Sequence, residues 1–151
     1  MENIVPVYVT ELTEAMSLSE ILEQGILKPS VASLDGAWRC DKCGAHGCGY
    51  RYTKFLRPLG KGLIVHINRI YQFERKSDQK IKISKKIHVR NSVLSLRAVV
   101  EHIGNSLGGH YICYRRLANG RWAMTSDATV KYMRGPPSSL EPYLLLYEPV
   151  A

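Results

Sequence analysis

The second half of the chain consists of short apolar segments with alternating polar residues, separated by turn signals rather than by helical patterns. Such closely spaced segments favour an antiparallel sheet, because parallel strands need a long crossover between them. Asn119-Gly120 is a strong hairpin signal between two of the segments. The predicted strands are Gly62–Ile70, Lys80–Val89, Leu94–His102, Tyr111–Arg115, Arg121–Met124 and Tyr143–Glu148. We therefore expect one continuous antiparallel sheet over this half of the chain.

A short helix is expected before the cysteines. The run Ser17–Glu20 (Ser-Leu-Ser-Glu) has the capping-box pattern that begins many helices. Apolar residues at Leu18, Ile21 and Leu22 give this helix one buried face. Gly25 is suited to end it.

Length and composition place the chain among globular proteins. Its 151 residues, 45% hydrophobic and 23% charged, predict one domain or one piece of a larger domain. No run approaches the roughly 20 apolar residues of a transmembrane helix, so we expect no membrane span within the chain. Residues 1–4 lack a basic region and a long apolar run, so they indicate neither a secretory signal nor a transit peptide.

The net charge of +8 raises the possibility of a nucleic-acid partner. The densest basic stretch, Lys80–Arg90, alternates its lysines with isoleucine and valine. This pattern is typical of strands with one solvated face, and no row of aromatic residues accompanies it. We therefore expect no nucleic-acid partner.

Three of the four cysteines lie within Cys40–Cys48. In a chain without a secretory signal, this spacing favours metal binding over a disulfide framework and indicates an intracellular, reducing compartment. A small basic zinc protein that binds nucleic acid stays open as an alternative, although it rests only on the charge and on Cys40-x-x-Cys43.

One stretch has the residues of an acid–base site. His110 follows two glycines, and Ser126 and Asp127 lie sixteen and seventeen positions later. A histidine with a hydroxyl or carboxylate partner can serve as a general base. Cys113 lies an odd number of positions from His110, so on a strand it faces the other side and is predicted to be a core thiol. The sequence therefore offers a base and its partner without a nucleophile.

Several segments in order resemble the ubiquitin-specific proteases, the papain-like cysteine deubiquitinases, in the C-terminal half of their catalytic domain. The similarity runs from about residue 17 to residue 148. The matching segments are Cys40-x-x-Cys43, Leu63–Arg69, Lys82–Val89, Leu96–Gly104, Gly109–Arg115, Trp122, Val130 and Tyr143–Glu148. The resemblance implies an α+β, papain-like fold: an antiparallel palm sheet with part of the fingers, the helical thumb half being absent. Residues 1–61 would hold the fingers portion and connecting helix, and residues 62–151 the palm.

The resemblance also assigns roles. His110 would be the general base of a thiol-dependent ubiquitin hydrolase, with Ser126 or Asp127 as the third member of its triad. Gly108 and Gly109, which lack side chains, would let the Gly-Gly tail of ubiquitin pass close to the backbone, with a simple tight turn as the alternative. Tyr111 would be a further substrate-binding residue, in the wall of the cleft. The nucleophilic cysteine and the oxyanion-hole asparagine of the family lie in upstream motifs that this sequence does not show.

A structural zinc ion is a further expectation, and catalysis would need no cofactor. Cys40 and Cys43 have zinc-knuckle spacing, but a structural site needs four ligands. The other two would come from an upstream finger, unless His46 or Cys48 replaces them.

Within the family, Ser126 four residues after Trp122, together with the tail Tyr143–Val150, is most similar to the member of the mitochondrial outer membrane. The implied location is that membrane, facing the cytosol, if an N-terminal anchor precedes the chain. The expected partners are ubiquitin and ubiquitinated proteins. A catalytically inactive ubiquitin-binding module is the alternative. Without the thumb, the isolated chain is expected to expose an apolar sheet face and to aggregate or require a partner.

Overall fold

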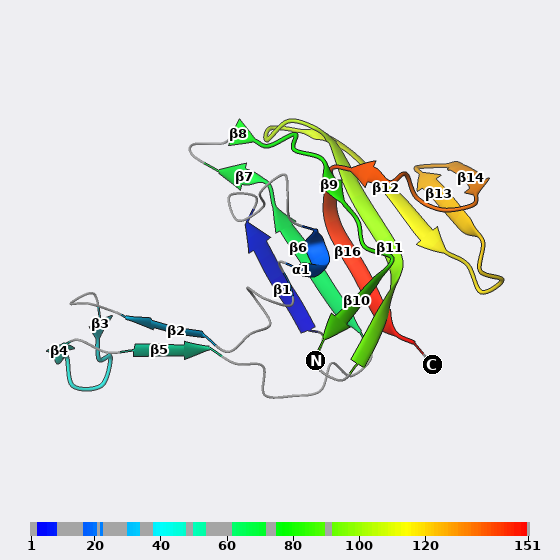
Figure 1. Cartoon of the computed structure of the whole chain (residues 1–151). Helices are drawn as coiled ribbons and strands as arrows, with labels where there is room; N and C mark the ends of the chain where they lie inside the picture. The colour runs from blue at the N-terminus through cyan, green and yellow to red at the C-terminus, as the bar shows by residue number, and fades with distance from the viewer. Residues whose placement is uncertain are drawn as a thin grey trace.

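The structure is a computed structural model that describes residues 3–8, 17–20, 22, 30–33, 38–47, 50–53, 62–71, 75–89 and 92–150. Its main feature is an eight-stranded sheet (Figure 1). The strands of this sheet are β1 (Asn3–Tyr8), β6 (Leu63–Asn68), β10 (Lys86–Val89), β11 (Ser92–Gly104), β12 (Gly109–Arg116), β13 (Trp122–Ser126), β14 (Thr129–Met133) and β16 (Pro142–Pro149).

The strand order is β1-β6-β16-β11-β12-β13-β14, and β10 pairs with the N-terminal part of β11. All pairings are antiparallel except that of β1 with β6, which is parallel. The continuous antiparallel sheet expected for the second half of the chain is confirmed.

Smaller elements flank this sheet. They are the helix α1 (Leu18–Glu20), the pair β7 (Ile70–Tyr71) and β8 (Arg75–Lys76), and the pair β9 (Ile81–Lys82) and β15 (Ser139–Leu140). Two further pairs extend away from it in Figure 1: β2 (Ser30–Ser33) with β5 (Tyr50–Thr53), and β3 (Trp38–Arg39) with β4 (His46–Gly47). No helix in the part of the chain that the structure describes is long and apolar enough to cross a membrane.

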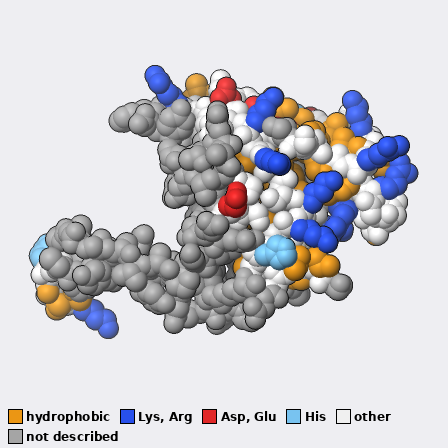
Figure 2. Space-filling view, viewed as in Figure 1, with side chains coloured by type: hydrophobic (Ala, Val, Ile, Leu, Met, Phe, Trp, Pro, Cys, Tyr) orange, Lys and Arg blue, Asp and Glu red, His pale blue; other side chains and the backbone are white. Residues whose placement is uncertain are grey.

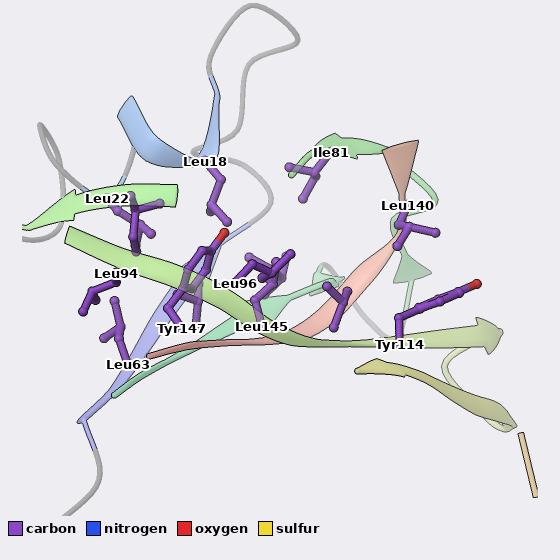
Figure 3. Close-up of a cluster of buried hydrophobic side chains, with 14 of the residues drawn as sticks. Leu18, Leu22, Leu63, Ile81, Leu94, Leu96, Tyr114, Leu140, Leu145 and Tyr147 are labelled. Carbon is purple, nitrogen blue, oxygen red and sulfur yellow. The ribbon is translucent and has the colours of Figure 1, made fainter. Parts of the chain in front are cut away.

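The hydrophobic core lies on one face of the main sheet. Alternate residues of β6 are fully buried while those between are half-buried, which gives the sheet a dry face and a partly covered one. Leu18 and Leu22 pack against the dry face from outside the sheet (Figure 3). Tyr147 lies among them and donates a hydrogen bond from its hydroxyl to the carbonyl of Ser84 at 2.8 Å. Burial raises the pKa of Tyr147, so this hydroxyl stays a donor.

The capping box at Ser17–Glu20 is present. The Glu20 carboxylate accepts from the Ser17 N–H at 2.8 Å, and the Ser17 hydroxyl accepts from the Glu20 N–H at 3.3 Å. The pKa of Glu20 is lowered first by the hydrogen bond that its carboxylate accepts from the Ser17 N–H and then by the one that it accepts from the Ser17 hydroxyl. The helix that follows is only three residues long in the described chain. Ile21 and Gly25, which completed the predicted helix, lie outside the described residues.

One predicted strand is divided. The segment Lys80–Val89 forms two strands, because β9 pairs with β15 whereas β10 pairs with β11. Between them the carbonyls of Ser84 and Lys85 accept hydrogen bonds from Tyr147 and Leu96 instead of continuing one ladder. The prediction of a single strand there was wrong, because two different neighbours satisfy the backbone of its two halves.

Candidate functional site

The side chains of His110 and Ser126 meet at the end of the β12–β13 pair. The Nε2 atom of His110 lies 2.7 Å from the Oγ atom of Ser126, a hydrogen bond whose donor depends on the tautomer of the ring. The β12–β13 ladder ends at Cys113 opposite Thr125. Continuing its register would set Ser126 diagonally across from His110 on the same side, within reach of a side-chain pair. The sheet therefore fixes this pair.

Asp127 adds a carboxylate next to the same ring. It begins the two-residue turn between β13 and β14, because Ser126 pairs with Thr129 across that turn. Its backbone φ of 48° is in the left-handed region, which aspartate tolerates better than most residues. Its Oδ2 lies 3.8 Å from Nδ1 of His110. The Asp127 side chain is 85% exposed, so water screens this contact strongly.

The hairpin that precedes His110 needs glycine at two positions. A Cβ on Gly109 would collide with the carbonyl of Ile103 and would approach His102 Cε1 to 2.7 Å. Gly104 has φ of 137° and leaves no room for a Cβ against the Gly108 carbonyl. The Oδ1 atom of Asn105 accepts from the N–H groups of Leu107 and Gly108, which fixes the loop between β11 and β12.

A pocket of about 340 Å³ lies beside this hairpin. It is lined by Arg69, Ile70, Lys76, His102, the loop 105–109, Tyr111 and Tyr143. The rings of His102 and Tyr111 are 4.7 Å apart and those of Tyr111 and Tyr143 are 5.8 Å apart, so three aromatic side chains form one wall. By strand alternation, Tyr111 and His110 face opposite sides of β12. The pocket and the His110–Ser126 pair therefore adjoin through the Gly108–Gly109 backbone.

Tyr143 reaches the pocket because of a bulge. The register between β11 and β16 shifts between Val100, which pairs with Leu144, and Glu101, which pairs with Pro142. Tyr143 is the extra residue of this irregularity, and bulges re-aim side chains in this way. Its ring also contacts His66, with centroids 4.9 Å apart.

Two cationic side chains, those of Arg69 and Lys76, line the pocket. Arg69 donates from Nε to the Pro142 carbonyl at 2.8 Å and from Nη1 to the carbonyls of Ser77 and Gln79 at 3.1 and 2.9 Å. Its Nη2 is buried without an acceptor among the described residues. Burial lowers the pKa of Arg69, opposed mainly by Glu141. Arg69 thus carries a spare donor next to the pocket.

Lys76 forms hydrogen bonds to the C-terminal end of β11. Its Nζ donates to the carbonyls of His102 and Gly104 at 2.5 and 3.0 Å and lies 3.8 Å from the carboxylate of Glu141. The pKa of His102 is lowered, first by partial burial and then by the nearby charge of Lys76. The imidazole of His102 is therefore favoured in its neutral form, which suits a wall of aromatic rings.

None of the described cysteines is placed to serve His110 as a nucleophile. Cys113 lies on β12 three residues from His110 and so faces the other side. Burial raises the pKa of the Cys113 thiol, which disfavours the reactive thiolate. Cys40 and Cys43 lie beside β3 and β4, which Figure 1 shows at the opposite end of the molecule from β13.

The knuckle at Cys40 has part of a zinc site. Gly44, with φ of 69°, donates its N–H to the Cys40 carbonyl at 2.8 Å, which closes a tight turn. Hydrogen bonds from the backbone of Cys43 and Lys42 lower the pKa of the Cys40 thiol, as a metal ligand requires. However, no group of three or more His, Cys, Asp or Glu side chains gathers among the described residues. These two thiols fit half of a four-ligand site, and Cys48 lies outside the described residues.

The structure therefore brings His110, Ser126 and Asp127 together, and it places Gly108, Gly109 and Tyr111 along the adjoining pocket. Sequence reasoning did not identify Lys76, His102 or Tyr143 as part of this region. For Tyr143 and Lys76 no local signal exists, since a bulge and a hairpin contact position them.

Comparison with known proteins supplies the family context. Residues 7–147 match the sequence profile of the ubiquitin carboxyl-terminal hydrolase family. A chain in the structure of the SAGA DUB module Ubp8/Sgf11/Sus1/Sgf73 bound to monoubiquitin is similar, with a TM-score of 0.68 and 18% identity, covering 99% of this chain and 35% of that one. The same module bound to ubiquitin aldehyde gives a TM-score of 0.67 at 17% identity, covering 99% and 36%. A yeast SAGA DUB module with an Sgf73 mutant gives 0.67 at 18%, covering 99% and 35%.

At this identity the structural likeness shows the fold alone. The chain spans about a third of the length of the solved chains it matches. The expected α+β, papain-like fold is confirmed, and most of its described part is antiparallel sheet.

Proposed function

Because the chain belongs to the ubiquitin carboxyl-terminal hydrolase family, we propose that its protein is a thiol-dependent deubiquitinase in which this chain supplies the general base, His110, and its orienting partner. The observation that carries the proposal is the hydrogen bond of 2.7 Å between His110 Nε2 and Ser126 Oγ. A histidine held through one ring nitrogen has its other nitrogen free for proton transfer.

The proposed reaction begins with a cysteine from a segment outside this chain. His110 Nδ1 takes the thiol proton, while its Nε2–H donates to Ser126. The thiolate attacks the carbonyl carbon of the terminal glycine of ubiquitin, and the imidazolium gives its proton to the departing lysine amine. Water, activated by the same imidazole, then hydrolyses the thioester and releases ubiquitin and the thiol. By itself the chain would perform none of these steps.

The pocket next to Gly108 and Gly109 is the proposed path for the ubiquitin tail. A tail that ends in two glycines can pass close to a backbone without side chains. The aromatic wall, with Tyr111 exposed over half of its surface, offers apolar contact to the preceding residues. The spare donor of Arg69 could be satisfied by a carbonyl oxygen of the bound tail.

We assign the orienting role to Ser126 rather than to Asp127. We expect Ser126→Ala to lower kcat about 10- to 100-fold with little change in KM, because the imidazole loses its direct partner. Ser126→Asp should restore most of the activity, since a carboxylate can also accept from Nε2–H. Asp127→Asn should lower kcat less than about threefold, and added salt should remove the difference.

Steady-state kinetics on ubiquitin joined to a fluorogenic amide, at low and high salt, distinguish these variants. If Asp127→Asn were the more damaging change at both salt concentrations, Asp127 would be the orienter. If Ser126→Asp failed to restore activity to a folded protein, a purely structural role for Ser126 would replace this assignment.

We also propose that the protein is intracellular and belongs with the mitochondrial outer-membrane branch of the family, the ubiquitin-specific protease 30 type. The support is Ser126 at the third triad position and the tail Tyr143–Val150. A catalytically inactive ubiquitin-binding module is the second candidate, favoured by the lack of a placed nucleophile among the described cysteines. The retained His110–Ser126 pair favours the enzyme, because binding alone needs no base.

A ubiquitin probe that carries a C-terminal thiol-reactive group tests the function. We expect that treating an extract of the source cells labels a species, detected by an antibody against this chain, much larger than 17.1 kDa plus one ubiquitin. Prior alkylation with N-ethylmaleimide should abolish the labelling. An unlabelled species of 17 kDa that still binds ubiquitin beads would instead support the binding module.

A further inference from the structure

The outer strand of the main sheet, β14, has no neighbour on its far side among the described residues. Such a strand presents unpaired N–H and C=O groups to solvent, and an extended peptide can pair with them. Two of its apolar side chains, Val130 and Tyr132, are exposed by 54% and 67%. They lie two positions apart and therefore project from the same side of the sheet.

The segment that forms this edge has an excess of basic residues. Residues 109–138, which contain β12 to β14, have five Lys or Arg residues against a single acid, Asp127; the difference, 5 − 1, is +4. This is half of the net charge of the whole chain, which is +8. Figure 2 shows Lys and Arg side chains gathered on the side of the molecule where β13 and β14 lie.

The cations are arranged around the apolar pair. The guanidinium of Arg121 lies 5.6 Å from the centre of the Tyr132 ring. Arg115 stands in the same cross-strand row as Tyr132, because both pair with Ala123. Lys131 is exposed between Val130 and Tyr132. A ligand strand on β14 would thus meet apolar and cationic side chains together.

We propose that β14 is the acceptor edge for an extended acidic segment of a partner protein, which adds to the sheet as a further antiparallel or parallel strand. Charge complementarity selects this occupant. A second copy of the chain would bring the same excess of positive charge to the edge, and lysine on an edge strand opposes self-pairing. An acidic strand would instead be attracted to the basic residues near β14. Its backbone would pair with β14, and its apolar residues would cover Val130 and Tyr132.

The proposed edge is separate from the pocket beside the β11–β12 hairpin, and it involves none of the residues placed in the catalytic site. It adjoins that site, because Thr129 of β14 pairs with Ser126. A bound strand would therefore lie next to the active site without requiring catalysis. Failure of the deubiquitinase proposal would leave this one standing, and the reverse is also true.

The test uses the full chain and a capped, fluorescein-labelled peptide of alternating glutamate and valine, about eight residues long to span a strand. Fluorescence anisotropy is measured at about 0.15 M salt. We expect saturable binding, and we expect the matching lysine–valine peptide not to bind. Methylating alternate backbone nitrogens of the acidic peptide should abolish binding, since it removes the edge hydrogen bonds. Amide hydrogen exchange should slow at residues 129–133.

Two double variants that change the net charge by the same amount, one near β14 and one away from it, serve as test and control. Arg121→Glu with Lys131→Glu should weaken binding at least about tenfold, whereas Lys82→Glu with Lys86→Glu, at exposed positions on β9 and β10, should change it less than about twofold. Tyr132→Ser should weaken binding without changing the net charge. Equal losses in the two double variants, tolerance of backbone methylation, or unchanged exchange at β14 would each overturn the proposal.

Discussion

If the proposed deubiquitinase activity holds, replacing His110 by glutamine is expected to lower kcat/KM of the whole protein by about 10²- to 10⁴-fold, the range typical of a general acid–base residue. Glutamine has a similar length and can still hydrogen-bond to Ser126, but it cannot take the proton of a thiol. The loss should therefore appear in kcat, with KM for ubiquitin conjugates little changed. Hydrolysis of ubiquitin with a fluorogenic amide measures both constants.

The control is binding of free ubiquitin. His110 is part of the proposed proton path and not of the pocket, so the glutamine variant should bind ubiquitin as tightly as the native protein. A variant that loses ubiquitin binding in parallel with activity would show that His110 acts in recognition. A native protein that binds ubiquitin but turns over no substrate, with or without His110, would establish the inactive binding module.

The antiparallel sheet could be predicted because its strands carry a local signal. Strand β6 alternates fully and partly buried residues along its length, and the sequence shows the same period. Strand β14 has only a short signal, Val130 and Tyr132 on either side of Lys131, and four of its five residues are exposed, so no buried apolar face marks it. It was missed, although it provides the edge on which the acidic-strand proposal rests.

Strand β1 was missed for a different reason. Pro6 lies in its middle, and proline lacks the N–H that a central strand requires. The structure resolves the conflict by placing β1 at the edge of the sheet, where β6 is its one partner among the described residues. Its parallel pairing also joins segments separated by a long stretch of chain, which no local pattern reveals.

Only part of the candidate site, likewise, could be predicted from the sequence. His110, Ser126 and Asp127 could be identified because they follow glycines and a strand end in a recognisable order. The pocket as a whole could not, because it is assembled from the ends of β7, β8, β11, β12 and β16. Its wall depends on the register irregularity at Tyr143, and such a bulge is defined by the pairing of two distant strands, which no local sequence pattern shows.

The same long-range assembly makes Arg69 a residue whose loss should strongly destabilise the fold. It is 1% exposed and donates three hydrogen bonds to carbonyl groups on two separate segments, the start of β16 and residues 77–79. We expect Arg69→Met to lower the free energy of unfolding by about 3–5 kcal/mol, because those buried carbonyls would lose their charged donor. Methionine fills similar space, so the loss should reflect hydrogen bonding more than a cavity.

The matched control is Arg97→Met. Arg97 forms an ion pair with Glu148 at 3.6 Å, and both side chains are more than a third exposed. Such surface pairs contribute about 0–1 kcal/mol, so the urea midpoint should move little. Arg69→Lys should recover only part of the lost stability, because one ammonium group cannot reproduce the planar fork that reaches Pro142, Ser77 and Gln79 together. Equal, small shifts of the urea midpoint for Arg69→Met and Arg97→Met would contradict the structural role of Arg69. Its remaining role would then be to donate a hydrogen bond from Nη2 to a ligand in the pocket.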